Sequence, residues 1–182
     1  IRRLIDPQGI NLGQRRITLS TVGIVPAIKR LSQEGLQITL AISLHAATDP
    51  LRDQLVPINR RYGLDALFEA CYRYVERTGR RVSFEWALIE GVNDTPEQAQ
   101  ALGARLKGLL AHVNLIPLNP TPGYEGRSPS QAALDAFTAV LNLYHIPHTV
   151  RVRRGFDIQA GCGQLRDRSQ SRSRSTNCAK SP

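Results

Sequence analysis

Apolar and polar positions along the chain follow two kinds of spacing, one typical of strands and the other of helices. Short runs rich in apolar and β-branched residues predict five strands, at 16–21, 36–44, 82–89, 113–119 and 148–152. The second run is almost continuously apolar, as is usual for a strand that is covered on both faces. Pro117 indicates that the fourth run is an edge strand or reaches its end there.

Between these runs, apolar residues recur with the 3.6-residue period of amphipathic helices. The predicted helices lie at 25–31, 64–78, 95–110 and 128–144, with a short helical turn at 49–55 and a basic, turn-rich loop at 1–15. Gly35 and Gly79 are expected to end the first two long helices, and Thr95-Pro96 has the form of an N-cap followed by proline. Strand and helix alternate about four times through short connections, which predicts βαβ units and a parallel sheet.

Length and composition fit one soluble globular domain with a real core, because the chain has 182 residues of which 41% are hydrophobic. No apolar run reaches the roughly 18 residues of a transmembrane span, and the first residues lack the apolar stretch of a signal peptide. The chain begins at Ile1 and contains no methionine, so we expect a fragment or a processed piece. Three cysteines without framework spacing indicate a reducing compartment and provide no complete metal site.

The formal charge of +9 is divided between the folded part and the C-terminal tail. Residues 166–182 carry five basic side chains against one aspartate, a net charge of +4, and the remainder carries +5. This surplus is compatible with a polyanionic partner such as RNA, although ordinary solubilising charge explains it equally well. The Ser/Arg-rich tail at 166–182 is expected to be disordered.

Candidate chemistry collects where the predicted strands end, which is where sites lie in parallel α/β proteins. Ser20, the segment Ser43-Leu44-His45, residues 85–93 and Asn119 each stand at such an end, and Cys162 lies between two glycines after the last strand. Hydroxyl, imidazole, amide and thiol groups together suit a polar small molecule with carboxylate, amine and hydroxyl groups.

Each of these residues also has a structural interpretation. Ser20 could cap the following helix, His45 could be a buried structural histidine, and Asn119 could shape a turn before proline. Cys162 could sit in a tight turn without chemistry, whereas Cys71 lies on the apolar side of a predicted helix and is expected to pack in the core. Residue spacing alone therefore predicts a site and no reaction.

Five segments, in order over about residues 10–165, resemble the radical S-adenosylmethionine (SAM) RNA adenine-C2 methyltransferases of the RlmN and Cfr type. Any one segment alone is weak, but five in order are specific. They are Arg15-Arg16-Ile17-Thr18-Leu19-Ser20-Thr21, Ala41-Ile42-Ser43-Leu44-His45-Ala46, Leu55-Val56-Pro57-Ile58-Asn59, Asn114-Leu115-Ile116-Pro117-Leu118-Asn119-Pro120 and residues 154–165.

The resemblance implies an α/β fold that is the C-terminal part of a radical-SAM (β/α)₆ barrel, a partial TIM-type barrel. Residues 1–165 would supply strands three to six of the barrel and the loop around Cys162. The implied activity is methylation of carbon 2 of an adenosine in 23S rRNA and in tRNA beside the anticodon. By similarity, SAM would be bound by Ser20, Ser43, Leu44, His45 and Asn119.

The family's mechanism, as the resemblance implies it, uses two SAM molecules. One methylates Cys162, and the other is cleaved reductively at a 4Fe–4S cluster. The resulting 5′-deoxyadenosyl radical takes hydrogen from the methylated Cys162, whose methylene radical adds to the base, and a second cysteine resolves the adduct through a disulfide. An electron donor such as flavodoxin, a monomeric state and a cytoplasmic location are implied as well.

The chain departs from the family pattern at several points. The three-cysteine cluster motif, the glycine–glutamate segment, the proton-handling glutamate and the resolving cysteine are absent and are expected before Ile1; Cys71 and Cys178 do not match them. Gly161 and Val22 replace the family's usual alanine and serine. We therefore expect no metal ligands in this chain and no activity from it alone. The alternative is a degenerate, non-catalytic fragment that acts as an RNA-binding module, and methylation at carbon 8 also stays open.

Overall fold

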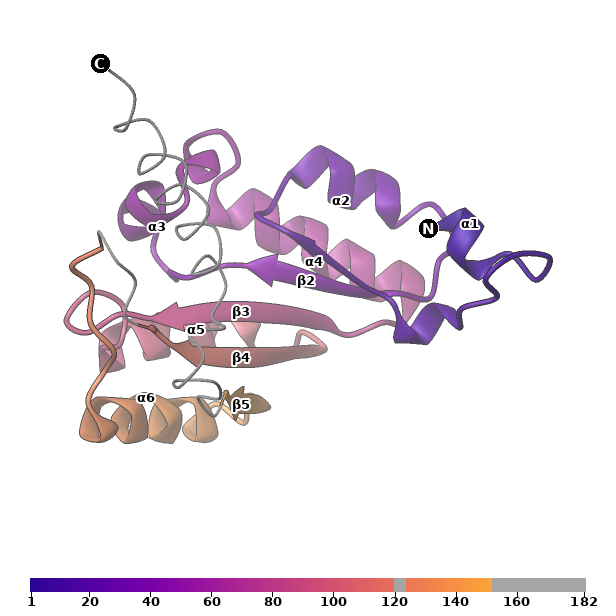
Figure 1. Ribbon diagram of the computed structural model, residues 1–182. Coiled ribbons are helices and arrows are strands. Elements are labelled where there is room, and N and C mark those ends of the chain that lie inside the picture. Colours follow the sequence, from indigo (N-terminus) through magenta and orange to yellow (C-terminus); the bar gives the residue numbers. More distant parts are fainter. Residues whose placement is uncertain (120–123, 152–182) are drawn as a thin grey trace, which may run out of the picture.

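The computed structural model describes residues 1–119 and 124–151, which form a parallel five-stranded sheet with helices packed against it (Figure 1). The strands follow one another in the sheet in the order of the sequence. They are β1 (Thr18–Thr21), β2 (Thr39–Ser43), β3 (Val82–Leu88), β4 (Ala111–Pro117) and β5 (His148–Val150). The predicted α/β class and parallel sheet are thus confirmed.

Two short helices, α1 and η1, precede β1, and the other helices occupy the connections between successive strands. They are α1 (Arg2–Ile5), α2 (Val25–Leu31), α3 (Asp49–Leu55), α4 (Leu64–Thr78), α5 (Pro96–Leu106) and α6 (Gln131–Leu143), with 3₁₀ helices η1 (Gln14–Arg16) and η2 (Pro57–Arg60). The predicted loop at 1–15 was wrong, because α1 and the start of η1 lie within it. A helix of a single turn is too short to show a hydrophobic period.

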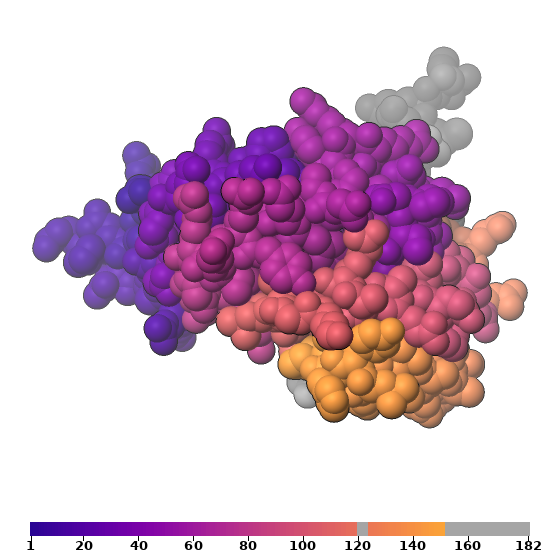
Figure 2. Space-filling view, turned by 180° about the vertical axis from the view of Figure 1, so that it is seen from behind, coloured from indigo at the N-terminus to yellow at the C-terminus, as the bar shows by residue number. Residues whose placement is uncertain are grey.

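The long helices α2, α4, α5 and α6 pack on the same face of the sheet. Crossovers between neighbouring parallel strands are right-handed, so crossovers that all advance in one direction place their helices on one side. A single core joins apolar side chains of these helices to alternate residues of the central strands, including Leu40, Phe84, Trp86, Val113 and Leu115. Seen from behind, the N-terminal residues (indigo) lie at one end, the last described residues (orange) lie along the lower side, and the middle of the sequence lies between them (Figure 2).

The opposite face of the sheet carries the polar side chains of the same strands. Successive residues of a strand point to opposite faces, so the neighbours of the core residues share this second side. The strand register aligns Ser43, Glu85, Asn114 and Thr149 in one row across four strands. We call this the polar face, defined by Thr18, Ser20, Thr39, Ala41, Ser43, Ser83, Glu85, Ala87, His112, Asn114, Ile116 and Thr149.

Pro117 ends β4, as predicted, but β4 is an interior strand between β3 and β5 rather than an edge. Pairing with β5 extends only from Val113 to Leu115. On the β5 side, Val113 donates its N–H to the carbonyl of Pro147 at 2.9 Å. Pro117 lies two residues beyond Leu115 and therefore faces the β5 side as well. Because β5 has already ended at this point, the N–H that proline lacks removes no hydrogen bond between the two strands.

Helix boundaries agree closely with prediction where caps are present. Helix α4 has the predicted bounds and ends at Gly79, whose φ is 62°. Helix α5 begins after Thr95, whose side chain accepts a hydrogen bond from the Gln98 N–H, but it ends at Leu106 rather than near 110. The backbone turns at Lys107, with ψ of 121°, and Gly108 has φ of 79°. Within the described ranges, no helix is both long and apolar enough to cross a membrane.

Gly103 of α5 lies against Tyr144 at the end of α6, and this contact gives a test of the packing. A Cβ at this position would lie 2.5 Å from Cγ and 2.7 Å from Cδ2 of Tyr144. We expect Gly103→Ala to lower the free energy of unfolding by about 1–3 kcal/mol, because the rigid ring base cannot move away cheaply. Urea titration measures this change.

The control is the same substitution in a Tyr144→Ala background, where the two closest ring atoms are gone. There the usual helix preference for alanine over glycine, about 0.5–1 kcal/mol, should offset most or all of the loss. An equal loss in both backgrounds would contradict the proposed contact.

Candidate functional site

The predicted site residues lie where the strands end, along one edge of the sheet. Ser20 is exposed on β1, Ser43 ends β2 and is half-buried, and Asn119 is exposed just beyond β4. His45 is half-buried, while the Leu44 side chain is fully buried in the core. Ser43 and His45 are therefore the side chains of this segment that can face a ligand. Cys162 lies outside the described residues.

The interpretation of Ser20 as a helix cap was wrong. Thr21, the next residue, makes the local hydrogen bonds: its Oγ1 accepts from the N–H groups of Gly23 at 3.2 Å and Ile24 at 3.5 Å. Ser20 is in register with Ala41 on β2, which places it on the polar face. Its hydroxyl is thus not occupied by capping α2.

The side chain of His45 takes the place of a backbone acceptor in the hydrogen bonding between β2 and β3. The β2 backbone bends away at His45, which adopts a left-handed conformation with φ of 60°. Its Nδ1 accepts a hydrogen bond from the Ala87 N–H at 3.0 Å. Because Nδ1 is an acceptor, the proton of the neutral ring sits on Nε2, and that N–H can donate to a ligand.

Burial lowers the pKa of His45, and the positive charge of Arg52 lowers it further, while the Glu85 carboxylate acts in the opposite direction. The hydrogen bond from Ala87 requires the neutral ring. Environment and geometry therefore agree that His45 is uncharged at neutral pH.

Asn93 fixes the backbone around His45, a role that the sequence did not show, although residues 85–93 were among the strand ends considered there. Its fully buried side chain donates to the carbonyls of His45 at 2.8 Å and Ala87 at 2.7 Å, and accepts from the Ile89 N–H at 2.7 Å. The Trp86 indole N–H donates to the Asn93 carbonyl at 3.2 Å. An amide residue in a turn directly after a strand was the available signal.

Arg52 is the second residue that sequence reasoning missed. Its side chain is 0% exposed. Nε donates to the Leu44 carbonyl at 3.1 Å, and Nη2 donates to the carbonyls of Val22 at 2.8 Å and Ser43 at 3.3 Å. One guanidinium therefore joins the chain just after β1 to the end of β2, the two segments that carry Ser20 and Ser43.

No carboxylate in the described residues forms a direct ion pair with Arg52. Asn59 instead connects the positive charge of Arg52 to two carboxylates through hydrogen bonds. Nη1 of Arg52 donates to Asn59 Oδ1 at 2.8 Å, and Asn59 Nδ2 donates to Asp49 at 2.8 Å and to Asp53 at 2.7 Å. Burial lowers the pKa of Arg52, and the Asp49 carboxylate opposes this. The guanidinium stays charged because an arginine does not lose its proton in a protein.

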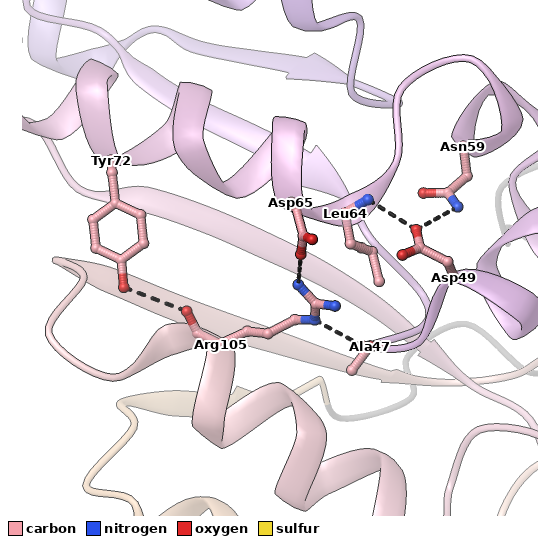
Figure 3. A network of polar contacts seen from close by, with 7 residues as sticks. All are labelled: Ala47, Asp49, Asn59, Leu64, Asp65, Tyr72 and Arg105. Atoms are coloured by element: carbon pink, nitrogen blue, oxygen red, sulfur yellow. Dashed lines mark hydrogen bonds and ion pairs between the residues drawn. The ribbon is translucent and has the colours of Figure 1, made fainter.

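Asp49 joins this network to α4 (Figure 3). Its Oδ1 accepts from the Leu64 N–H at 2.9 Å, at the start of the helix. Burial raises the pKa of Asp49, but the hydrogen bonds from Leu64 and Asn59, with the charges of Arg105 and Arg52, lower it overall. The carboxylate is therefore ionised at neutral pH.

The loop after His45 is held by α5 (Figure 3). Arg105 donates through Nε to the Ala47 carbonyl at 2.9 Å and through Nη1 to Asp65 at 2.8 Å. Gln98 accepts from the Ala47 N–H at 3.1 Å. The segment that bears Ser43 and His45 is thus fixed on both sides, as a preorganised ligand site requires.

Cys71 packs in the core, as predicted, and burial raises the pKa of its thiol to about 12. Such a thiol stays protonated and is not a nucleophile at neutral pH. Residues 1–119 and 124–151 contain no group of three or more histidine, cysteine, aspartate or glutamate side chains that could hold a metal ion. The described part of the chain therefore does not fit an iron–sulfur cluster.

Comparisons with solved structures define the class of fold. A radical SAM methyltransferase from Sphaerobacter thermophilus is 54% identical and superposes with a TM-score of 0.84, covering 88% of this chain and 47% of that one. A domain of a pyruvate-formate lyase-activating enzyme from Bacteroides vulgatus shares the fold at 15% identity, with a TM-score of 0.58 over 74% of this chain and 80% of that domain. The chain has the α/β fold of the radical SAM enzymes.

Curated relatives narrow the class. The dual-specificity RNA methyltransferase RlmN 1 of Myxococcus xanthus is 54% identical over 171 residues, and a probable RlmN of Desulforudis audaxviator is 54% identical over 172 residues. Each match covers 94% of this chain, but only 48% and 54% of the relatives, so the chain spans about half of their length. No protein-family model matches. The chain is a homologue of the RlmN-type RNA methyltransferases over nearly all of its residues.

The Arg52 network gives a stability prediction. Arg52→Met keeps the length of the side chain but leaves the carbonyls of Val22, Ser43 and Leu44 without their donor. We expect the free energy of unfolding, measured by urea titration, to fall by about 3 kcal/mol or more. In the control Arg73→Met, which removes an exposed ion pair to Glu69 at 2.8 Å, the change should stay within about 0.5 kcal/mol. Similar losses in the two variants would contradict the role of Arg52.

The environment of His45 gives a pH prediction. Because its pKa is lower in the folded than in the unfolded chain, the unfolded chain binds more protons as the pH falls below about 6.5. The stability contribution of the neutral ring is complete above about pH 6.5 and is lost as the pH falls toward the folded-state pKa.

NMR titration of the His45 ring signal measures this directly. The midpoint should lie below 6.5 in the folded protein and near about 6.5 in urea. Loss of the signal in His45→Asn assigns it, since asparagine tolerates the left-handed backbone. A folded-state midpoint at or above 6.5 would refute the proposed hydrogen bond to Nδ1.

Proposed function

We propose that this chain forms the SAM-binding, methyl-carrying part of an RlmN-type enzyme that methylates carbon 2 of an adenosine in 23S rRNA and in tRNA beside the anticodon. The observation that carries the proposal is the segment Ser43-Leu44-His45. It lies at the carboxyl end of β2, held by Arg52, Asn93 and Arg105, in a chain 54% identical to a dual-specificity RNA methyltransferase.

The side chains at this edge are suited to the polar groups of SAM. His45 can donate through Nε2–H, and the hydroxyls of Ser20 and Ser43 can donate or accept. The amide of Asn119 would add a further contact from the end of β4. Hydrogen bonds to the carboxylate, the amine and the ribose hydroxyls of SAM would orient the molecule along the strand ends.

Cys162 is proposed as the methyl carrier. Carbon 2 of adenine is electron-poor and does not attack a methyl sulfonium, so the methyl group has to reach the base from another atom. Gly161 and Gly163 remove side-chain bulk beside the thiol, which allows the loop to bring sulfur close to SAM and then to the base.

A 4Fe–4S cluster, when bound, would supply the electron for reductive cleavage of SAM. The described residues do not fit this group. In the proposed enzyme, an electron donor such as flavodoxin would deliver the electron, and the protein would act as a cytoplasmic monomer.

A chimera tests the proposed function. Residues 1–182 would replace the matching half of the Myxococcus xanthus relative, and the fusion would be expressed in a strain without its own enzyme. Mass spectrometry of rRNA and tRNA nucleosides should detect 2-methyladenosine, and Cys162→Ala should abolish it because the methyl group then has no carrier. The matched control Cys178→Ala should leave the yield unchanged.

Each other result has a clear meaning. Methylation retained in Cys162→Ala would exclude the carrier role, and 8-methyladenosine would reassign the carbon. RNA binding without any methylated adenosine would favour the non-catalytic RNA-binding alternative. The separate 182-residue chain is expected to form no methyladenosine.

A further inference from the structure

Glu85 stands in the middle of the polar face, on the central strand β3. Its half-buried carboxylate accepts two hydrogen bonds at the same oxygen, Oε1: from the Ser83 hydroxyl at 3.0 Å and from Asn114 Nδ2 at 2.8 Å. Asn114 also donates to the Ser83 hydroxyl at 3.0 Å. These contacts fix the plane and direction of the carboxylate.

The second carboxylate oxygen, Oε2, accepts neither of these hydrogen bonds. Within the described part of the chain, neither a hydrogen-bond donor nor a basic side chain pairs with it. A held carboxylate with one oxygen available is a strong acceptor for a charged or polar donor. A half-buried negative charge without a counter-ion also favours a cationic partner.

The carboxylate belongs to the same site as the SAM-binding residues of the proposed function. Glu85 is in register with Ser43 on the adjacent strand, and neighbouring strands lie about 4.8 Å apart. The charge of Glu85 also reaches His45, whose pKa it tends to raise. Glu85, in the middle of β3, therefore lies beside Ser43 and His45 at the end of β2.

We propose that Glu85 is a ligand-binding residue whose Oε2 contacts the cationic methionyl part of SAM, its sulfonium or ammonium group. The proposal rests on the proposed function and adds to it a residue from β3. SAM has two positive groups and one carboxylate, so it complements a single fixed negative charge. An RNA phosphate would be repelled by the same carboxylate, so this region fits the small cation rather than the RNA backbone.

Glu85→Gln is the sharpest variant, because the hydrogen-bond pattern predicts how glutamine would sit. Its Oε1 can keep the contacts to Ser83 and Asn114, which places an uncharged NH₂ where Oε2 was. The internal network survives while the outward acceptor becomes a donor. Glu85→Asp keeps the charge but withdraws it by one methylene. Glu76→Gln is the control, since Glu76 is exposed on α4, on the helix-covered side of the sheet.

Isothermal titration of the 182-residue chain with SAM and with 5′-methylthioadenosine tests the proposal. The second ligand keeps the adenosine and the thioether but lacks both positive groups. We expect Glu85→Gln to weaken SAM binding by roughly tenfold or more, Glu85→Asp to weaken it less, and Glu76→Gln to leave it unchanged. Unchanged methylthioadenosine binding in Glu85→Gln would show that the variant is folded.

Two results would overturn the assignment of Glu85. One is SAM binding in Glu85→Gln within a factor of about two of the wild type, and the other is an equal loss for both ligands. A wild-type chain that binds no SAM would instead overturn the proposed function, and the assignment of Glu85 with it. The two failures are thus distinguishable.

Discussion

The buried guanidinium of Arg52 is the interaction on which the candidate site depends. It binds the carbonyls of Val22, Ser43 and Leu44, where the chain leaves β1 and β2 and backbone groups would otherwise lose their ladder partners. Burying unpaired carbonyls is costly, and burying an unpaired cation costs more. The relay through Asn59 to Asp49 and Asp53 meets both demands. Four side chains of α3 and η2, those of Arg52, Asp49, Asp53 and Asn59, are thereby joined to the ends of β1 and β2.

The sheet separates packing from chemistry by its two faces. Right-handed crossovers that advance in one direction gather the helices, and with them Trp86, Phe84 and the rest of the core, on one side. The second side is left with Ser83, Glu85 and Asn114, which satisfy one another by hydrogen bonds. Stability therefore comes mainly from the first face, and the polar face can carry groups chosen for binding. His45 lies just after β2 and Asn93 just after β3, and a hydrogen bond joins the two residues.

Homology and geometry contribute different parts of the functional argument. Identity of 54% to RlmN-type methyltransferases over nearly the whole chain assigns the relationship, but the match spans about half of those proteins. Geometry shows that the segment with Ser43 and His45 is held by side chains from neighbouring elements, with Glu85 in register beside it; ligand binding by these residues is our proposal.

Local patterns in the sequence determined most of the elements and the strand ends at which the candidate residues lie. Hydrophobic periodicity and a glycine cap defined α4, and the rule that sites lie at the ends of parallel strands selected Ser43 and His45. These two signals could be found because each depends only on residues near one another in the chain. Only the tertiary structure decided the roles of Arg52, Asn93 and Glu85. Arg52 reads locally as a polar residue of a short helix, yet it is buried because Val22, 30 residues earlier, and Ser43 supply its acceptors. Such contacts arise from how the strands are arranged in space, and no local pattern of hydrophobic and polar residues encodes them.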